Sequence, residues 1–441
     1  TKTFEIVDST AVDWVQWLTG KLPGGGVIGY DPWLHTRGAI ASQTKPAALK
    51  KLKLKPLARN PVDAIWGKQR PKDPSGPIVV QPIELAGVPA GDKIASLQKT
   101  LVEAGEDAVI LTLPDSICWL LNIRGSDVAH NPTVLAFMIV PKSGKPELFM
   151  AADKVVGDAK AHLKPVVTVH PPEALSARVE ALKKSGKRVR LDPATAADWF
   201  FNKLAKAVSE NVDPCILPKA KKNAVELEGA RAAHIRDGAA VCRFLAWLDR
   251  AAPSGKIDEI TAVTRLEQER ASTQKLKEIS FATISGSGPN GAIVHYRVST
   301  ETNRKLQPGE LFLVDSGAQY QDGTTDITRT VAIGKPTREM CERFTLVLKG
   351  HMAIASARFP KGTRGVQLDT LARHAMWQRG FDFDHGTGHG IGSYLSVHEG
   401  PQSISKRGMA VLEAGMIVSN EPGYYKNGHY GIRLENLEVV R

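Results

Sequence analysis

The chain has 441 residues, of which 42% are hydrophobic and 24% charged, and it carries a formal net charge of +12. This length allows roughly two to four domains with sizeable cores, and the lack of any run of about 18 apolar residues excludes a membrane-spanning helix. Much of the basic excess lies in short runs at 45–56, 183–190 and 219–222. None of these runs is interleaved with aromatic residues or forms a recognisable nucleic-acid-binding module. We therefore expect a solvated basic surface and no binding to nucleic acid or membrane.

Cysteine usage indicates the redox compartment. The four cysteines (Cys118, Cys215, Cys242 and Cys341) are scattered along the chain without a C-x-x-C pair. Such spacing favours buried free thiols over a disulfide framework. We therefore expect a protein of a reducing compartment, the cytoplasm.

Residues 1–88 form the first expected domain, of the α/β class. FEIV (4–7) and GVIGY (26–30) are typical of short strands, AVDWVQWL (11–18) of a helix, and RPKDPSGP (70–77) of a proline-rich connection. The chain opens without a methionine, on what reads as a strand already in progress. We therefore expect part of this domain to be missing.

Residues 89–218 form the second expected domain. A helix is predicted over 92–105 and another near 173–184, and strands over 107–113, 133–140 and 188–192. This alternation of helices and strands predicts a compact α/β domain that ends near residue 218.

Residues 219–441 form the third expected domain. Asn223 can cap a helix in which Glu226 completes a capping box, and the amphipathic run continues to about residue 250. Further helices are predicted at 256–272, 338–359 and 366–379, and strands at 311–319, 326–334, 416–423 and 431–440. Helices and antiparallel strands are segregated, which indicates an α+β domain.

The stretch DHGTGHGIG (384–392) holds two histidines and four glycines. Its glycines do not follow G-x-G-x-x-G, and H-E-x-x-H is absent. Glycine at alternate positions also disfavours a helix. The stretch therefore reads as a strand or loop, in which His385 and His389 point to the same face.

Two aspartates lie on the predicted hairpin LFLVDSGAQYQDGTTDITRT (311–330). A two-residue turn at Asp322–Gly323 would place Asp326 opposite Gln319, far from Asp315. A loop centred between residues 320 and 321 would instead set Asp315 directly opposite Asp326. Facing carboxylates repel unless a cation lies between them.

Two glutamates also lie in predicted strands that are otherwise apolar. Glu421 ends MIVSN and Glu435 lies within GIRLENLEVV. A buried glutamate is costly unless it is paired or bound to metal. Salt bridges to Arg433 or Arg329 are the simpler explanation for either glutamate alone, but four acids and a histidine on neighbouring strands favour a metal site.

The composition of this set indicates two ions. Four carboxylates balance the charge of two divalent cations, which in such sites lie about 3.5–4 Å apart and share bridging carboxylates. Oxygen donors with a single imidazole favour manganese over zinc, with cobalt as a further alternative. His389 is the expected imidazole ligand, because the flanking glycines would let its strand approach the cluster.

The five residues, in the order Asp315, Asp326, His389, Glu421 and Glu435 within DSGAQYQDGTTDITRT, HGTGHGIGSYLSVHEGP, SNEPGYY and GIRLEN, resemble the ligand set of pita-bread metallopeptidases. GPNGAIVHYRV (288–298) and NIRGSDVAHNP (122–132) extend the resemblance to the three-domain, cytosolic aminopeptidase P (Xaa-Pro aminopeptidase) family. The resemblance implies a C-terminal pita-bread (creatinase/methionine aminopeptidase-like) catalytic domain at 219–441, preceded by two creatinase-N-like α/β domains, the first incomplete.

The resemblance also implies roles for individual residues. Asp315 would chelate one ion, His389 and Glu421 mainly the other, and Asp326 and Glu435 would bridge. Glu421 would also shuttle a proton, and His398 would donate to the oxyanion. His295 and His385 would take part in catalysis and line the substrate subsites around the scissile bond and the proline ring. Arg433 would support the metal ligands without binding the metal itself. His351, His374 and His429 have no motif context, and we expect no functional role for them.

The implied activity is removal of the residue that precedes proline at a peptide's N-terminus, by a cytoplasmic homodimer. The family carries a C-terminal extension where this chain stops six residues after Glu435. A prolidase-type Xaa-Pro dipeptidase is the nearest alternative, although prolidases usually have two domains. Methionine aminopeptidase fits less well because it lacks the long N-terminal domains. A non-catalytic pita-bread binding protein would typically have lost metal ligands, and all five are present here.

Overall fold

The computed structural model describes residues 5–8 and 11–441. The chain forms two compact units that do not follow chain order: unit 1 comprises residues 1–75, 91–121 and 135–214, and unit 2 comprises 76–90, 122–134 and 215–441. The boundaries expected at 88 and 218 stay predictions. Every helix among the described residues is too short or too polar to span a membrane.

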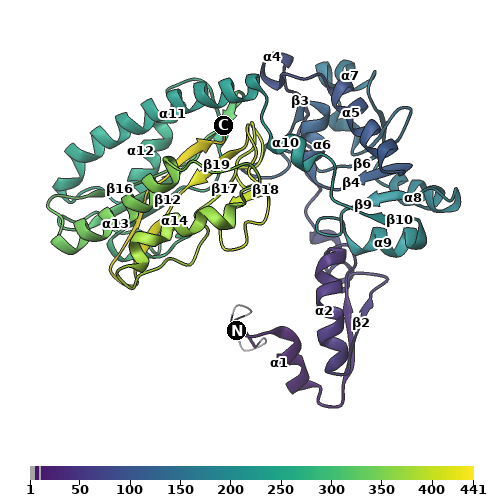
Figure 1. The fold of residues 1–441 in the computed structure, drawn as a ribbon, viewed down its shortest axis with the longest axis horizontal. Coiled ribbons are helices and arrows are strands. Elements are labelled where there is room, and N and C mark those ends of the chain that lie inside the picture. The colour runs from purple at the N-terminus through teal and green to yellow at the C-terminus, as the bar shows by residue number, and fades with distance from the viewer. Residues whose placement is uncertain (1–4, 9–10) are drawn as a thin grey trace. The chain divides into compact units, whose positions relative to one another are not determined.

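Unit 1 contains a mixed six-stranded sheet with helices around it (Figure 1). The sheet order is β10-β9-β4-β6-β7-β8, and β4 pairs parallel with β9 but antiparallel with β6. Apolar residues of α8 and α9 pack with the strands in one core. The α/β class predicted for this segment is therefore confirmed. The elements are α5 (Ala90–Glu103), β4 (Ala108–Leu111), α6 (Pro114–Leu121), β6 (Phe137–Pro141), β7 (Glu147–Phe149), α7 (Gly157–Leu163), β8 (Thr168–His170), α8 (Ala174–Lys184), β9 (Val189–Leu191), α9 (Asp198–Leu204) and β10 (Val208–Glu210).

Residues 26–56 contribute a small parallel strand pair to unit 1. The strand predicted at 26–30 is β1 (Gly26–Tyr30), which pairs in register with β2 (Leu52–Pro56). Helices α1 (Trp14–Lys21) and α2 (Arg37–Leu49) cover it through Val15 and Ala47, and α3 (Pro61–Trp66) follows. The strand expected at FEIV is not formed by residues 5–7, which are irregular, and Phe4 lies outside the described residues.

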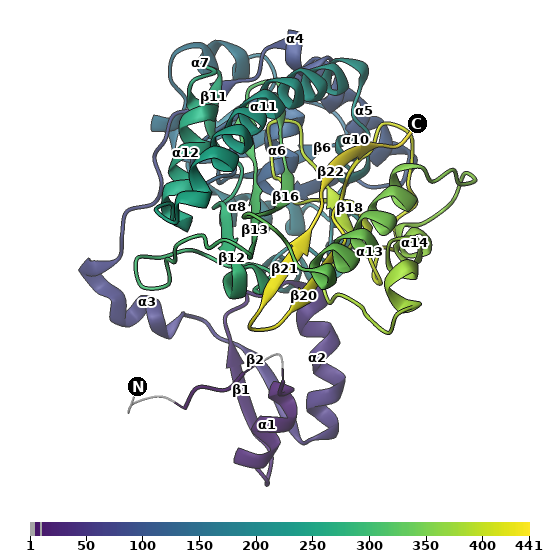
Figure 2. The same cartoon turned by 90° about the vertical axis from the view of Figure 1, so that its left-hand side faces the viewer.

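Unit 2 has the α+β organisation predicted from the segregated pattern. Its strands lie between the helix pair α11 and α12 and the helix pair α13 and α14 (Figures 1 and 2). The helices are α11 (Ala224–Ala251), α12 (Glu259–Ala271), α13 (Arg338–Ala355) and α14 (Gly365–Trp377). The predicted capping box is present, because Asn223 accepts from the backbone N–H of Glu226 and the Glu226 carboxylate accepts from that of Asn223.

Three strand groups carry the candidate site residues. One sheet has the order β12-β13-β16, a second β18-β17-β19-β22, and β20 pairs with β21. The strands of these groups are β12 (Ile284–Ser287), β13 (Leu311–Ser316), β16 (Ile327–Ala332), β17 (Gly388–Gly390), β18 (Glu399–Ile404), β19 (Ile417–Asn420), β20 (Gly423–Lys426), β21 (Tyr430–Arg433) and β22 (Asn436–Val439), and a further sheet of order β11-β14-β15 contains β11 (Leu276–Ile279), β14 (Ala318–Tyr320) and β15 (Gly323–Thr324). Apolar side chains bury β13, β20 and β21 against α13 and α14, so the site is built on rigid elements.

Candidate functional site

The hairpin that carries the two aspartates adopts neither expected register. Asp315 pairs with Thr328, and the two-residue turn falls at Gln321–Asp322, with Tyr320 opposite Gly323. Asp326 lies two residues before Thr328, so it is a diagonal neighbour of Asp315 on the same face of the strand pair. The two carboxylates therefore share a face without standing directly opposite each other.

The two glutamates are brought together by a second strand pair. β19 and β22 pair antiparallel, and Asn420 opposite Asn436 is the last pair of that ladder. Glu421 follows Asn420 and Glu435 precedes Asn436, so the glutamates lie at opposing positions just beyond the ladder. The two arginines considered as salt-bridge partners of these glutamates bond to other groups. Arg433 pairs with Asp315, and Arg329 donates to the backbone carbonyl of Glu435 at 2.7 Å.

His389 lies on β17, at the centre of the glycine-rich stretch. The predicted extended conformation is confirmed for residues 388–390. A Cβ on Gly388 would lie 1.8 Å from the carbonyl oxygen of Ser419, and one on Gly390 would lie 2.1 Å from that of Glu399. The glycines are thus required because neighbouring strands pack closely against β17. The expectation that they also let this strand approach the acids stays a prediction.

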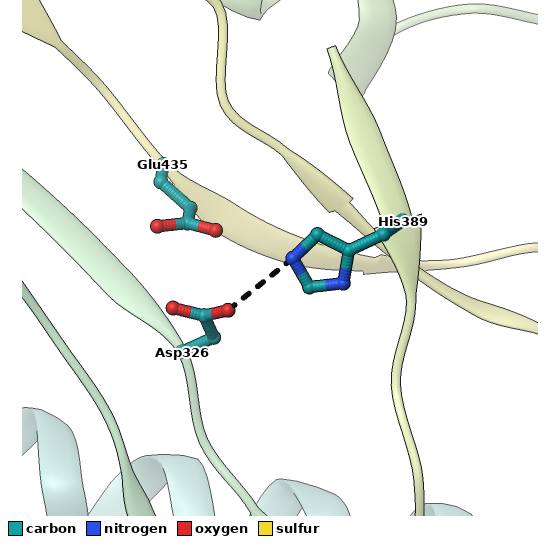
Figure 3. A group of neighbouring side chains, drawn as sticks. All are labelled: Asp326, His389 and Glu435. Atoms are coloured by element: carbon teal, nitrogen blue, oxygen red, sulfur yellow. Dashed lines mark ion pairs between the residues drawn. The ribbon is translucent and has the colours of Figure 1, made fainter. Parts of the chain in front are cut away.

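The imidazole of His389 faces the acids (Figure 3). Its Nε2 lies 3.5 Å from Asp326 Oδ2 and 3.4 Å from Glu421 Oε1. Asp326, His389 and Glu435 each offer one potential ligand atom, and these three atoms lie within 4.8 Å of one another. Nδ1 lies 2.9 Å from the carbonyl oxygen of Gly390 and can donate to it, which leaves the Nε2 lone pair available to a cation.

Behind the acids, a buried arginine connects the cluster to a second histidine. Arg433 Nη2 donates to Asp315 Oδ2 at 2.6 Å, and Nη1 donates to the Tyr425 hydroxyl at 2.7 Å. The same hydroxyl lies 2.8 Å from His385 Nε2, while His385 Nδ1 lies 2.7 Å from the carbonyl oxygen of Gly386. Hydrogen bonds therefore connect His385, Tyr425, Arg433 and Asp315 in this order, and neutral His385 can accept from the Tyr425 hydroxyl.

All nine residues expected at the site line one cavity of about 340 Å³. They are His295, Asp315, Asp326, His385, His389, His398, Glu421, Arg433 and Glu435. The His398 ring lies edge-on to that of His389, with centroids 4.2 Å apart. Phe281, Ile284 and Val294 supply an apolar wall. The cavity thus combines a concentrated acid cluster with room for part of an apolar substrate.

The positively charged side chains around the acid cluster do not fully offset the cost of burying its carboxylates in the ionised form. Burial raises the pKa of Asp326 to about 6, and the Asp315 charge adds to the rise. Burial likewise raises the pKa of Glu421 to about 7 and that of Glu435 well above its usual range. Burial alone would lower the pKa of His389, but the Asp326 and Glu421 carboxylates outweigh it and raise that pKa to about 9. The cluster therefore favours additional positive charge.

Two other histidines that line the cavity are held neutral. Burial lowers the pKa of His385 to about 3, with Arg433 contributing, and that of His398 to about 4, with His389 contributing. A neutral imidazole has one donor and one acceptor, and both are already used within the protein at His385, by the Gly386 carbonyl and the Tyr425 hydroxyl.

The donor set fits divalent cations. Four carboxylates and one imidazole are the ligands that such ions take in proteins. Asp315 Oδ1 is buried and has no hydrogen-bond partner among the described residues. Thr328 Oγ1 donates to Glu435 Oε2 at 2.7 Å and Ser419 Oγ to Glu421 Oε1 at 3.0 Å, which orients these carboxylates and leaves their other oxygens for a cation.

Several residues of the site had not been singled out from the sequence. They are Tyr425 and Ser419, which lie within SNEPGYY, Thr328, which lies within DSGAQYQDGTTDITRT, and Phe281, which lies outside the motifs already noted. The stretch 122–134 also supports the site, because Arg124 Nη2 donates to the carbonyl oxygen of Ser393 at 2.9 Å and Asn131 Nδ2 donates to Ser396 Oγ at 3.0 Å. These bonds hold the loop that leads to His398.

Known proteins resemble the chain along most of its length. Residues 228–441 match metallopeptidase family M24, and residues 69–226 match the creatinase/prolidase N-terminal domain. A probable Xaa-Pro aminopeptidase P of Neosartorya fischeri is 41% identical over 97% of this chain and 67% of that protein. Aminopeptidase P2 of Arabidopsis thaliana is 40% identical over 97% of this chain and 65% of that protein.

Solved structures agree with these matches. The X-prolyl aminopeptidase of Caenorhabditis elegans, described as a cytosolic enzyme with a di-nuclear active site, superposes with a TM-score of 0.92 at 37% identity and covers 97% of this chain and 71% of that one. An Xaa-Pro dipeptidase of Bacillus anthracis reaches a TM-score of 0.66 at 26% identity and covers 80% of this chain and 95% of that one. The aminopeptidase therefore matches a larger part of the chain.

Proposed function

The chain belongs to metallopeptidase family M24, and we propose that it is an Xaa-Pro aminopeptidase, which removes the first residue of peptides whose second residue is proline. The observation that carries this proposal is the extent of the similarity, since proteins named Xaa-Pro aminopeptidase P match 97% of the chain at 40–41% identity. An Xaa-Pro bond is a tertiary amide without an N–H, so its recognition must depend on shape and on the amide oxygen.

The acid cluster would hold the metal. Two divalent cations agree with the family and with the di-nuclear site of the Caenorhabditis elegans enzyme, and manganese suits a set of oxygen donors with one imidazole. The expected ligands are Asp315, Asp326, His389, Glu421 and Glu435, with Asp326 and Glu435 shared. Ions bound there would polarise the scissile carbonyl and activate water.

The protein's own groups would bind and orient the peptide. His295, His385 and His398 line the cavity beside the acids, where His398 can donate an N–H to the developing oxyanion. Glu421 is the proposed proton carrier, because Ser419 fixes its Oε1 at 3.0 Å and thereby directs the carboxylate. The walls formed by His385 and by Phe281, Ile284 and Val294 would exclude water from an apolar side chain or the proline ring.

Two alternatives make different predictions. A prolidase-type dipeptidase shares the fold, but the dipeptidase of Bacillus anthracis matches only 80% of the chain. A non-catalytic binding protein would not be expected to keep five ligands in one cavity. We further propose a cytoplasmic location, as described for the Caenorhabditis elegans enzyme. The homodimer and the domain boundaries near 88 and 218 stay predictions.

Peptide hydrolysis distinguishes these alternatives. Purified protein, stripped with a chelator and reloaded with Mn²⁺, should release arginine from Arg-Pro-Pro and leave Arg-Ala-Ala intact. Cleavage of Ala-Pro alone would favour a dipeptidase. Loss of all peptide turnover, with Mn²⁺ bound, would favour a binding protein. Reloading with Co²⁺ or Zn²⁺ in parallel tests the preference for manganese.

A further inference from the structure

His351 occupies a buried position on α13, behind the acid cluster. Its side chain is only partly accessible, at 8% exposure for the residue. Nδ1 lies 3.0 Å from the carbonyl oxygen of Asn420 and can donate to it. The Asn420 side chain donates in return from Nδ2 to the backbone carbonyl of His351 at 2.9 Å. Helix α13 is thereby joined by two hydrogen bonds to the end of β19.

The other ring nitrogen contacts the neighbouring strand. Asn436 Nδ2 lies 3.1 Å from His351 Nε2. Arg329 Nη2 donates to Asn436 Oδ1 at 3.0 Å, which fixes the orientation of the amide and points its NH₂ group at the imidazole. Nε2 is therefore the acceptor and Nδ1 the donor. Burial lowers the pKa of His351, in agreement with a neutral ring.

The two asparagines adjoin the two glutamates of the site. Asn420 precedes Glu421, Asn436 follows Glu435, and the asparagines form the last pair of the β19–β22 ladder. Beyond that pair, the strands separate into the segment that presents both carboxylates. One imidazole thus contacts both strands at the residue next to each glutamate, and Arg329 Nη1 adds a bond to the carbonyl oxygen of Glu435 at 2.7 Å.

We propose that His351 is a positioning residue that fixes the spacing of Glu421 and Glu435 for metal binding. This inference rests on the proposed function, because it assumes that the two glutamates hold ions. A buried histidine with satisfied hydrogen bonds could also serve stability alone. The two roles differ in one respect: a positioning residue changes the affinity of the folded protein for metal, whereas a residue needed only for stability does not.

The test compares His351→Phe with a matched variant, His374→Phe. Phenylalanine keeps an aromatic ring at position 351 but removes the hydrogen bonds of both ring nitrogens. His374 serves as the control because it is an exposed residue of the adjacent helix α14. Calorimetric titration of the metal-free proteins with Mn²⁺ should show an affinity about 10- to 100-fold weaker for His351→Phe, as is common when groups that support metal ligands are lost. His374→Phe should bind Mn²⁺ as the native protein does.

A second variant covers the possibility that His351→Phe does not fold. Asn436→Ala changes an exposed residue and removes the donor to Nε2, so Mn²⁺ affinity should fall by about three- to tenfold, the equivalent of one neutral hydrogen bond. Unchanged Mn²⁺ affinity in a folded His351→Phe, or in Asn436→Ala if the former is insoluble, would overturn the inference while leaving the proposed function intact. A native protein that binds no Mn²⁺ would instead overturn both.

Discussion

Arg433 and Asp315 form a buried ion pair in which Nη2 lies 2.6 Å from Oδ2, and Asp315 Oδ1 has no hydrogen-bond partner within residues 5–8 and 11–441. Among the described residues that line the cavity, Arg433 is the one arginine or lysine, and it hydrogen-bonds to a candidate ligand. Without metal, it is the main compensation for the Asp315 charge. With metal bound, an ion would share that task.

This pairing predicts that Arg433→Met destabilises the metal-free protein more than the Mn²⁺-loaded protein. Removing one partner of a buried pair costs about 3–5 kcal/mol when nothing replaces it. The Mn²⁺-induced rise in Tm, measured by calorimetry, should therefore be larger in the variant than in the native chain. The exposed Arg379 provides the control, and an equal rise in Arg433→Met and Arg379→Met would contradict the prediction.

The raised pKa values predict how the stability of the metal-free protein depends on pH. Burial raises the pKa of Glu421 to about 7, and the neighbouring carboxylates raise that of His389 to about 9 against the effect of burial. The folded state therefore binds these protons more tightly than the unfolded state, and the resulting stability is lost as pH rises through the folded pKa values.

The Tm of the metal-free protein should accordingly fall between about pH 6.5 and 8. Protein loaded with Mn²⁺ should show little change over the same range, because the ions replace the protons. Scanning calorimetry in matched buffers, with and without chelator, measures both profiles. A metal-free Tm that rises with pH in this window would refute the expected sign.

The packing of β17 predicts that Gly388→Ala is strongly destabilising. Its Cβ would lie 1.8 Å from the backbone oxygen of Ser419, and a clash with backbone cannot be relieved by a rotamer change. We expect a loss of at least about 1–3 kcal/mol in the free energy of unfolding, together with weaker metal binding. Gly400→Ala is the control because a Cβ there meets nothing within 4 Å. Similar denaturation midpoints for the two variants would contradict this explanation.

From the hydrogen bonds of the Tyr425 hydroxyl, we predict that Tyr425→Phe lowers the catalytic efficiency. Tyr425→Phe removes the group that lies between His385 Nε2 and Arg433 Nη1, at 2.8 and 2.7 Å. A hydrogen bond to a charged donor contributes about 1.5–3 kcal/mol, so kcat/KM for an Xaa-Pro peptide should fall by at least about tenfold. Mn²⁺ affinity should change less, because Arg433 keeps its bond to Asp315. The neighbouring Tyr424→Phe should retain native kinetics, and equal losses in both variants would argue against a role for the hydroxyl.

Much of the local structure and the membership of the cavity followed from the sequence. The capping box at Asn223 and Glu226 is formed as predicted, because capping depends on residues three apart. The helix predicted over 256–272 is α12, Glu259–Ala271. The five proposed ligands and the three histidines were found from motif order and reach one cavity, although their roles remain proposals.

The register of the aspartate hairpin was decided by tertiary structure. Local turn chemistry favours Asp-Gly at the centre of a turn, yet the turn falls at Gln321–Asp322. Asp322 is held there by α11, since Arg236 donates to both carboxylate oxygens at 3.0 and 2.7 Å, and a Cβ on Gly323 would meet the Ala230 backbone at 3.1 Å. No local pattern encodes a partner 86 residues away.

The same distinction holds for His351, for which the sequence alone gave no reason to expect a role. Its proposed role depends on contacts with Asn420 and Asn436, which are 69 and 85 residues away in the chain. The sequence therefore determined which residues could bind metal, because ligand chemistry belongs to side-chain type and order. Only the tertiary structure decided how those candidate residues are spaced and supported, because register and buried hydrogen bonds arise from contacts between distant segments.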